Sequence, residues 1–304
     1  MRRFLTGLSR DTWWKVLLTG GLAWAGGIAA TAYTRDGILL PGVFLLGSFL
    51  VPFALLVGLI EYVTRLWLAD DDATALVPFQ LLLAFAAGGA LGLWPAALVE
   101  HFLTRLIPDG YFLSVALAEE TVKLAIVILL AVGLTSYRRR DGLLLGAAVG
   151  LGFSAFESAG YAYEAVRSQS AIDIPAIVEV QLSRGLLSPV GHALWTALVA
   201  GALFAAASST GRLRPTWSVC GWLGVAVLLH AGWDVSAGLA AALVATGYRE
   251  SLTLAEFRRG VVPAPTATES ALLGTVRTFL LAINAALGLV LVRWQWQRPG
   301  DTAG

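Results

Sequence analysis

The chain alternates between long apolar runs and short polar segments, and this pattern predicts a bundle of membrane-spanning helices. About 20 predominantly apolar residues are needed to cross roughly 30 Å of hydrocarbon as a helix. The stretches that meet this condition are residues 13–33, 39–61, 76–98, 112–134, 142–164, 185–208, 218–242 and 271–293. We therefore expect an all-α, polytopic membrane protein with about eight transmembrane helices.

The connections between the stretches are mostly short and contain the Pro, Gly, Asp and Arg that end helices. The longest, 165–184 and 243–270, have room for segments at the membrane surface. If the stretches alternate in direction, most Lys and Arg residues lie on the side of the two termini. Cytoplasmic loops are enriched in these residues, so we expect both termini in the cytoplasm of a bacterial cell and one integral membrane domain over 1–304.

Composition excludes several classes of protein. The 304 residues are 57% apolar and 13% charged, with a mean hydropathy of +0.74, whereas soluble chains are roughly 45–50% apolar and 25% charged. The net charge of +1, without a basic face beyond Arg138–Arg140, gives no reason to expect nucleic acid as a partner. Cys220 is the single cysteine, which excludes an internal disulfide and a cysteine-based zinc module. The expected solvent is the lipid bilayer.

Some ionisable residues lie where hydrocarbon is expected. Residues such as Glu100 and Arg277 lie near the ends of spans, where headgroups can solvate them. The residues deep inside a span are Glu119, Glu120, Lys123, Glu157 and Asp234. Each ionised group near the bilayer centre costs about 2.5–3.5 kcal/mol, so five unpaired groups would cost on the order of 12–17 kcal/mol. These side chains must therefore face inward, toward one another, water or a metal ion.

The buried polar groups share one depth. His192 and His230 lie in the same four stretches as the five charged residues, between 112 and 242. At 1.5 Å per residue, most of these groups lie roughly 10–12 Å below the outer surface, and His230 about 18 Å below it. A network that only joins helices normally uses Ser, Thr, Asn or Gln. A functional site in residues 112–242, with 1–111 and 243–304 as flanking helices, is the favoured interpretation.

The cluster has an excess of negative charge. Its acidic members are Glu119, Glu120, Glu157 and Asp234. Their charges sum to −4 and Lys123 brings the total to −3, so the pocket must hold protons or a cation. Two neutral imidazoles and a carboxylate suit zinc, with a fourth position for water. His230 and Asp234 share a helix face, as do Glu119 and Lys123. Glu120 points about 100° away from Glu119, which predicts different roles for the two.

Small residues recur every four positions in the fifth stretch. They are Gly142, Gly146, Gly150, Ser154 and Ser158. Such a stripe permits close approach of a neighbouring helix and would hold the adjacent Glu157 tightly. Ser154 is interpreted as a packing residue. No His-Glu-x-x-His motif is present, and Asp234 is the one aspartate inside a span, which argues against zincin and paired-aspartate sites.

Four motifs occur in order on four successive stretches: Glu119-Glu120-x-x-Lys123, Phe153-x-x-x-Glu157, His192 and His230-x-x-x-Asp234. In this order they resemble the PrsW family of intramembrane proteases, which is related to the CAAX-processing and bacteriocin-processing membrane proteases. The resemblance covers roughly 112–240. It implies proteolysis of membrane-protein substrates, with anti-sigma factors as the associated class. CAAX-type enzymes usually have a histidine where Glu157 stands, which favours the PrsW branch.

The expected reaction is hydrolysis of a peptide bond by water in a cavity open to the extracytoplasmic side. Glu119 would be the general base, Glu120 would relay the proton or orient a ligand, and Lys123 would hold Glu119 ionised. The expected ligands of a metal ion, with Zn²⁺ as the expected ion, are Glu157, His192 and His230, and Asp234 is expected as a further ligand or as a hydrogen-bond partner of His230. A metal-free reaction, in which a glutamate activates the water and the histidines stabilise the oxyanion, stays open.

Two other functions fit the same residues. Buried carboxylates and histidines also form relays in proton- or ion-coupled transporters, which predict internal repeats and broken helices. A non-catalytic scaffold built on a protease fold is the third interpretation.

Overall fold

The regular structure is helical throughout the part of the chain that the computed structural model describes, which comprises residues 11–69, 74–167, 172–208, 210–248 and 251–298. The helices are α2 (Thr12–Thr34), η1 (Gly37–Leu39), α3 (Leu40–Ala69), α4 (Pro78–Ala90), α5 (Leu93–Leu106), η2 (Pro108–Gly110), α6 (Tyr111–Ala131), α7 (Arg139–Arg167), α8 (Ile174–Ser208), α9 (Trp217–Asp234), α10 (Ser236–Tyr248), α11 (Leu254–Arg259) and α12 (Ala267–Gln297). The all-α prediction is confirmed.

Each predicted span coincides with one helix or with two consecutive ones. Five helical segments, comprising α2, η1 with α3, α7, α8 and α12, are long and apolar enough to cross a membrane. Two bent pairs add to these: α4 and α5 meet at 41°, and α9 and α10 meet at 47°. The structure thus supports five to seven spans by length and composition, and α6, which carries Glu119, Glu120 and Lys123, is the remaining predicted one. The count of eight stays a prediction.

The helix that contains the sixth predicted span begins before that span. Residues 165–184 were expected to connect two spans, but α8 already begins at Ile174 and contains Arg184. A polar contact explains the longer helix. Gln181 donates from Nε2 to the carbonyls of Val43 and Phe44 on α3 at 2.9 and 3.2 Å, and accepts from Trp24 Nε1 on α2 at 2.6 Å. The first turns of α8 are therefore fixed against the N-terminal helices.

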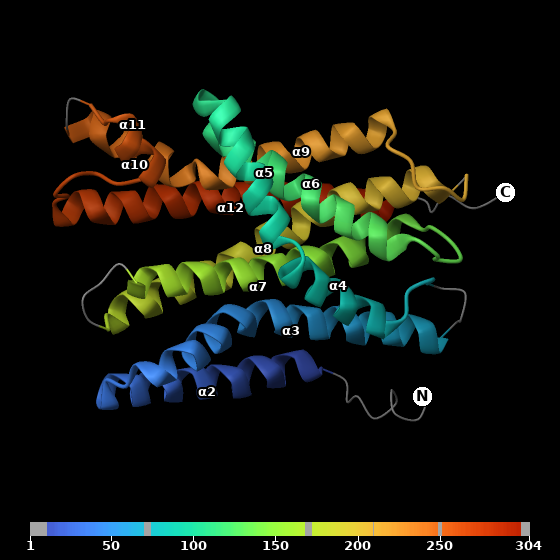
Figure 1. Cartoon of the computed structure of the whole chain (residues 1–304), viewed down its shortest axis with the longest axis horizontal. Helices are drawn as coiled ribbons and strands as arrows, with labels where there is room; N and C mark the ends of the chain where they lie inside the picture. Colours follow the sequence, from blue (N-terminus) through green and yellow to red (C-terminus); the bar gives the residue numbers. More distant parts are fainter. Residues whose placement is uncertain (1–10, 70–73, 168–171, 209, 249–250, 299–304) are drawn as a thin grey trace.

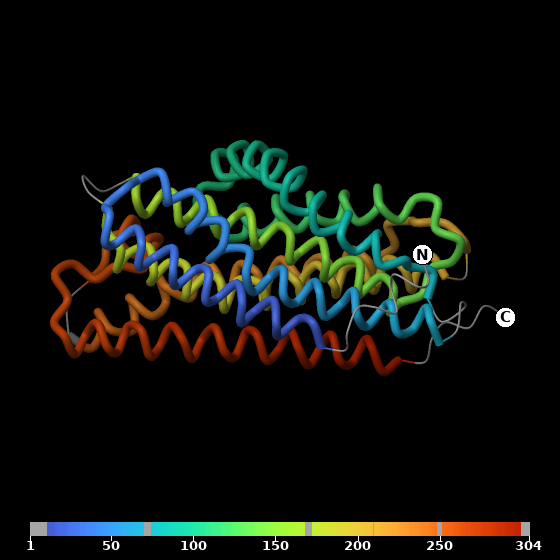
Figure 2. Tube along the Cα trace, turned by 90° about the horizontal axis from the view of Figure 1, so that it is seen from below, coloured from blue at the N-terminus to red at the C-terminus, as the bar shows by residue number. Residues whose placement is uncertain are grey.

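The long helices run lengthwise in one bundle, with α7 and α8 in its middle (Figure 1). Helices α2 and α3 cover one flank and α9, α10 and α12 lie on the other. Helix α5 projects out of the bundle in both views (Figures 1 and 2). Helix α2 begins and α12 ends at the same end of the bundle, which agrees with an even number of crossings.

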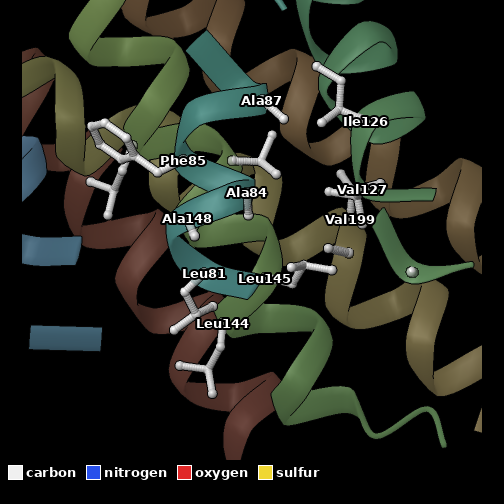
Figure 3. Close-up of a cluster of buried hydrophobic side chains, with 14 of the residues drawn as sticks. Leu81, Ala84, Phe85, Ala87, Ile126, Val127, Leu144, Leu145, Ala148 and Val199 are labelled. Atoms are coloured by element: carbon white, nitrogen blue, oxygen red, sulfur yellow. The ribbon is translucent and has the colours of Figure 1, made fainter. Parts of the chain in front are cut away.

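A dry core joins the helices that carry the polar cluster. Leu81 and Phe85 of α4, Val127 of α6, Leu145 of α7 and Val199 of α8 pack together in it (Figure 3). All five are at most 5% exposed. In a bilayer, packing of this kind, rather than exclusion from water, holds helices together.

The small-residue stripe of α7 contacts α8, as predicted. A Cβ added at Gly150 would lie 2.2 Å from the carbonyl oxygen of His192, and one at Gly146 would lie 2.6 Å from the carbonyl oxygen of Thr196. Ser154 donates to Ser188 across the same interface at 3.1 Å. The backbones of α7 and α8 therefore approach closely, which places Glu157 beside His192.

Candidate active site

Lys123 lies at the centre of the polar cluster, with no exposed surface. Its ammonium group donates to Glu119 Oε2 at 3.0 Å and to Glu120 Oε1 at 2.8 Å, both on α6. It also lies 2.8 Å from His192 Nδ1 on α8 and 4.0 Å from the ring centroid of Phe153 on α7. An ammonium group has three hydrogens to donate, and each has an acceptor here.

The neighbours of His192 determine which of its nitrogens carries the proton. Lys123 can only donate, so His192 Nδ1 must be the acceptor. His192 Nε2 then carries the hydrogen and lies 3.1 Å from Glu157 Oε2 on α7. A carboxylate thus fixes the imidazole so that its lone pair faces the centre of the cluster.

His230 on α9 is held in a similar way by a different carboxylate. Its Nδ1 lies 2.9 Å from Glu120 Oε1, and Trp195 stacks on the imidazole with ring centroids 4.4 Å apart. His230 Nε2 faces Glu119 Oε2 at 3.7 Å and Asp234 Oδ2 at 3.5 Å. A carboxylate can only accept, so Nδ1 donates to Glu120 and Nε2 is the nitrogen that faces these two acids.

The structure brings the predicted side chains together. Those of Glu119, Glu120, Lys123, Glu157, His192, His230 and Asp234 form one network in which each lies within 4.0 Å of another. They come from α6, α7, α8 and α9, the helices that match the predicted core stretches. The roles assigned to the individual residues stay predictions.

One side of the cluster opens into a cavity of about 540 Å³. Glu119, Glu157 and Asp234 line this cavity. Glu120 does not line it, and its carboxylate contacts Lys123, His230 and Thr196 instead. The hydrogen bond and the ion pairs of Glu119 with other described residues are all made by Oε2. Glu119 is therefore the member of the glutamate pair that can meet water.

Three residues fit a metal ion within the part of the chain described by the structure. Glu119, His192 and His230 each offer one ligand atom, and these atoms lie within 4.8 Å of one another. Glu157 and Asp234, two of the predicted ligands, are not in this group. Glu157 instead contacts the far nitrogen of His192, as outer carboxylates of metal-binding histidines do.

Arg184 is a site residue that the sequence analysis missed. Its guanidinium lies 2.6 Å from Glu157 Oε2 and 3.8 Å from the ring centroid of Tyr161. The expected connection 165–184 contains Arg184. The apolar residues Ile174 and Ile177, however, continue the helical pattern upstream of it, and they were the signal available in the sequence. Glu100 and Arg277, interpreted as headgroup-level residues, also line the cavity.

A family model described as PrsW family intramembrane metalloprotease matches residues 77–257. This range contains α4 to α10 and every member of the polar network. No curated protein and no solved structure matches the chain.

Proposed function

The chain belongs to the PrsW family of intramembrane metalloproteases, and on that premise we propose that it hydrolyses peptide bonds of membrane proteins at the polar cluster between α6 and α9. The observation that carries this proposal is Glu119, a buried carboxylate with one oxygen held among Lys123 and two histidines and the side chain lining a cavity. Single-span anti-sigma factors are the proposed substrate class, and the extracytoplasmic half of the bilayer is the proposed place of cleavage.

Glu119 acts as the general base. Oε2 receives the hydrogen bond of Lys123, which fixes the carboxylate and offsets its charge, while Oε1 takes a proton from water in the cavity. The water oxygen forms a bond to the substrate carbonyl carbon. The bond from that carbon to the amide nitrogen then breaks, and the proton passes from Glu119 to the leaving amine. Glu120 holds His230 in place and does not touch the substrate.

The donor set fits a divalent cation, most plausibly Zn²⁺. Glu119, His192 and His230 would hold it, and ligation through His192 Nδ1 would take over the contact of that nitrogen with Lys123. The formal charge supports this fit, because four carboxylates, Lys123 and Arg184 sum to −2. When bound, the ion would polarise the carbonyl and make water more acidic.

Cleavage of a single-span substrate by the protein in proteoliposomes tests the proposal. We expect Glu119→Gln to lower kcat by roughly 10²- to 10⁴-fold, the usual contribution of a general base. Glu61→Gln is the matched control, since Glu61 is a buried glutamate of α3 that accepts from the backbone of Thr12, away from the cluster. Unchanged cleavage in folded Glu119→Gln would remove the assignment, and proton or ion flux without cleavage would favour a transporter.

Metal analysis of the same preparations tests the donor set. We expect about one ion per chain in the wild type, with loss of the ion in His192→Ala and His230→Ala and loss of cleavage on chelation. Active wild type without bound metal would favour the metal-free reaction, in which Glu119 remains the base.

A further inference from the structure

Arg184 and Glu157 form an ion pair where the polar cluster meets the cavity. Arg184 is on α8 and Glu157 is on α7, and their nearest charged atoms lie 2.6 Å apart. The side chains are only 23% and 16% exposed. The Arg184 guanidinium also covers the ring of Tyr161, one turn after Glu157 on α7, at 3.8 Å. A planar guanidinium held by a carboxylate and an aromatic face has little freedom to reorient.

The Glu157 carboxylate links two side chains of the same neighbouring helix. Its Oε2 lies 2.6 Å from the Arg184 guanidinium and 3.1 Å from His192 Nε2. Arg184 and His192 are eight residues apart, or about 12 Å along α8. Glu157 therefore connects Arg184 to the imidazole of His192. The other nitrogen of that imidazole, Nδ1, lies 2.8 Å from Lys123 Nζ.

We infer that Arg184 is a positioning residue that acts through Glu157. This role rests on the proposed function: Arg184 holds the Glu157 carboxylate beside His192 Nε2, so that the Nδ1 lone pair of the imidazole faces Glu119. Removing its charge leaves Glu157 with no described lysine or arginine as a salt-bridge partner, and the site then has a formal charge of −3. Glu157 is then free to turn toward the cavity, and His192 loses the contact that fixes its tautomer.

Substrate binding is the competing role for Arg184. The residue lines the cavity, and its Nε is buried without a hydrogen-bond partner among the described residues. A residue that binds substrate changes KM, whereas one that orients a catalytic imidazole changes kcat. The two roles therefore separate in steady-state kinetics.

The kinetic experiment compares five variants with the wild type. We expect Arg184→Gln to lower kcat by roughly 10- to 100-fold with KM within twofold. Arg184→Lys should recover part of that loss. The double variant Arg184→Gln/Glu157→Gln should be no slower than Glu157→Gln alone, because both changes break one pathway. Arg167→Gln is the matched control, since it breaks the Arg167–Glu164 pair, which joins the same two residue types at 2.8 Å but has side chains that are 62% and 55% exposed.

A second measurement needs no substrate. The chain has three histidines, His101, His192 and His230, so ¹⁵N-histidine spectra can resolve the tautomer of each. We expect Arg184→Gln to change the His192 signals and to leave those of His101 unchanged, and Arg167→Gln to change neither.

Three outcomes would overturn the inference: a raised KM with unchanged kcat, unchanged His192 signals in Arg184→Gln, or a double variant far slower than Glu157→Gln. If Arg184→Gln does not fold, the same kinetics and histidine spectra are measured on Arg184→Lys and on the double variant Arg184→Gln/Glu157→Gln, in which both charges of the pair are removed. These measurements then test the role of Arg184. A wild type that cleaves nothing would contradict the proposed function, and the histidine spectra would still decide the role of Arg184.

Discussion

Lys123 is the residue on which the geometry of the cluster depends most. It is fully buried, and its ammonium group joins both glutamates of α6 to His192 of α8. Without it, two adjacent carboxylates would face each other in a medium with little water, and His192 Nδ1 would lose its donor. Breaking a buried ion pair on one side costs much more than the pair contributes, since it leaves a buried charge uncompensated.

We expect Lys123→Met to lower the free energy of unfolding by about 3–5 kcal/mol, as measured by chemical unfolding in detergent micelles. Lys15→Met is the natural control, because Lys15 is the other lysine of the chain and lies exposed on α2. That change should stay within about 0.5 kcal/mol. Equal effects of the two substitutions would contradict the buried network.

At the scale of the helix, the α7–α8 interface decides where the site residues lie. Three glycines and two serines on one face of α7 let the two backbones approach so closely that Gly150 contacts the peptide carbonyl of His192. Glycine weakens an isolated helix by about 1 kcal/mol relative to alanine, so its use here reflects the need for space.

We expect Gly150→Ala to destabilise the protein by about 1–3 kcal/mol and to reduce cleavage, because the added methyl group would displace the backbone at His192. Gly221→Ala serves as the comparison. Gly221 is exposed on α9 with no atom within 4 Å of an added Cβ, so alanine there should be neutral or stabilising by up to about 1 kcal/mol. Similar melting temperatures for both variants would argue against the close approach.

The sequence was sufficient to locate the helices and the polar cluster, since apolar length and the cost of buried charge are local properties. It was insufficient for Arg184, because the start of α8 depends on the contact of Gln181 with α2 and α3. The sequence also did not distinguish Glu157, which lies beside the far nitrogen of His192, from Glu119, which belongs to the group that fits a metal ion. Whether Glu157 faces an ion or the back of His192 depends on side-chain directions across two helices.

At the scale of the whole molecule, the alternation of helices gives the bundle two ends. Helix α2 begins and α12 ends at one end of the bundle, whereas α7 ends and α8 begins at the opposite end (Figure 1). Of the basic residues that predict cytoplasmic termini, Arg2, Arg3 and Arg10 lie outside the described residues. Arg184 lies in the expected connection 165–184, on the side opposite the termini, but the structure places it within α8.

Labelling of single cysteines from one side of intact cells tests this orientation. In a Cys220→Ser background, we expect Thr210→Cys to react with an impermeant maleimide only after permeabilisation, because the α8–α9 connection is predicted to be cytoplasmic. Ser251→Cys, in the α10–α11 connection, should react without it. Both positions are exposed. The reverse pattern would invert the predicted topology.

The stacking of Trp195 on His230 has an optical consequence. The indole is 1% exposed, and its ring centroid lies 4.4 Å from that of His230 and 5.0 Å from that of His192. A paramagnetic ion such as Co²⁺ bound by the two imidazoles would quench the fluorescence of this tryptophan, and a difference from Trp195→Phe would isolate its emission from that of the other ten. Trp195 would thus act as an intrinsic fluorophore for occupancy of the proposed metal site.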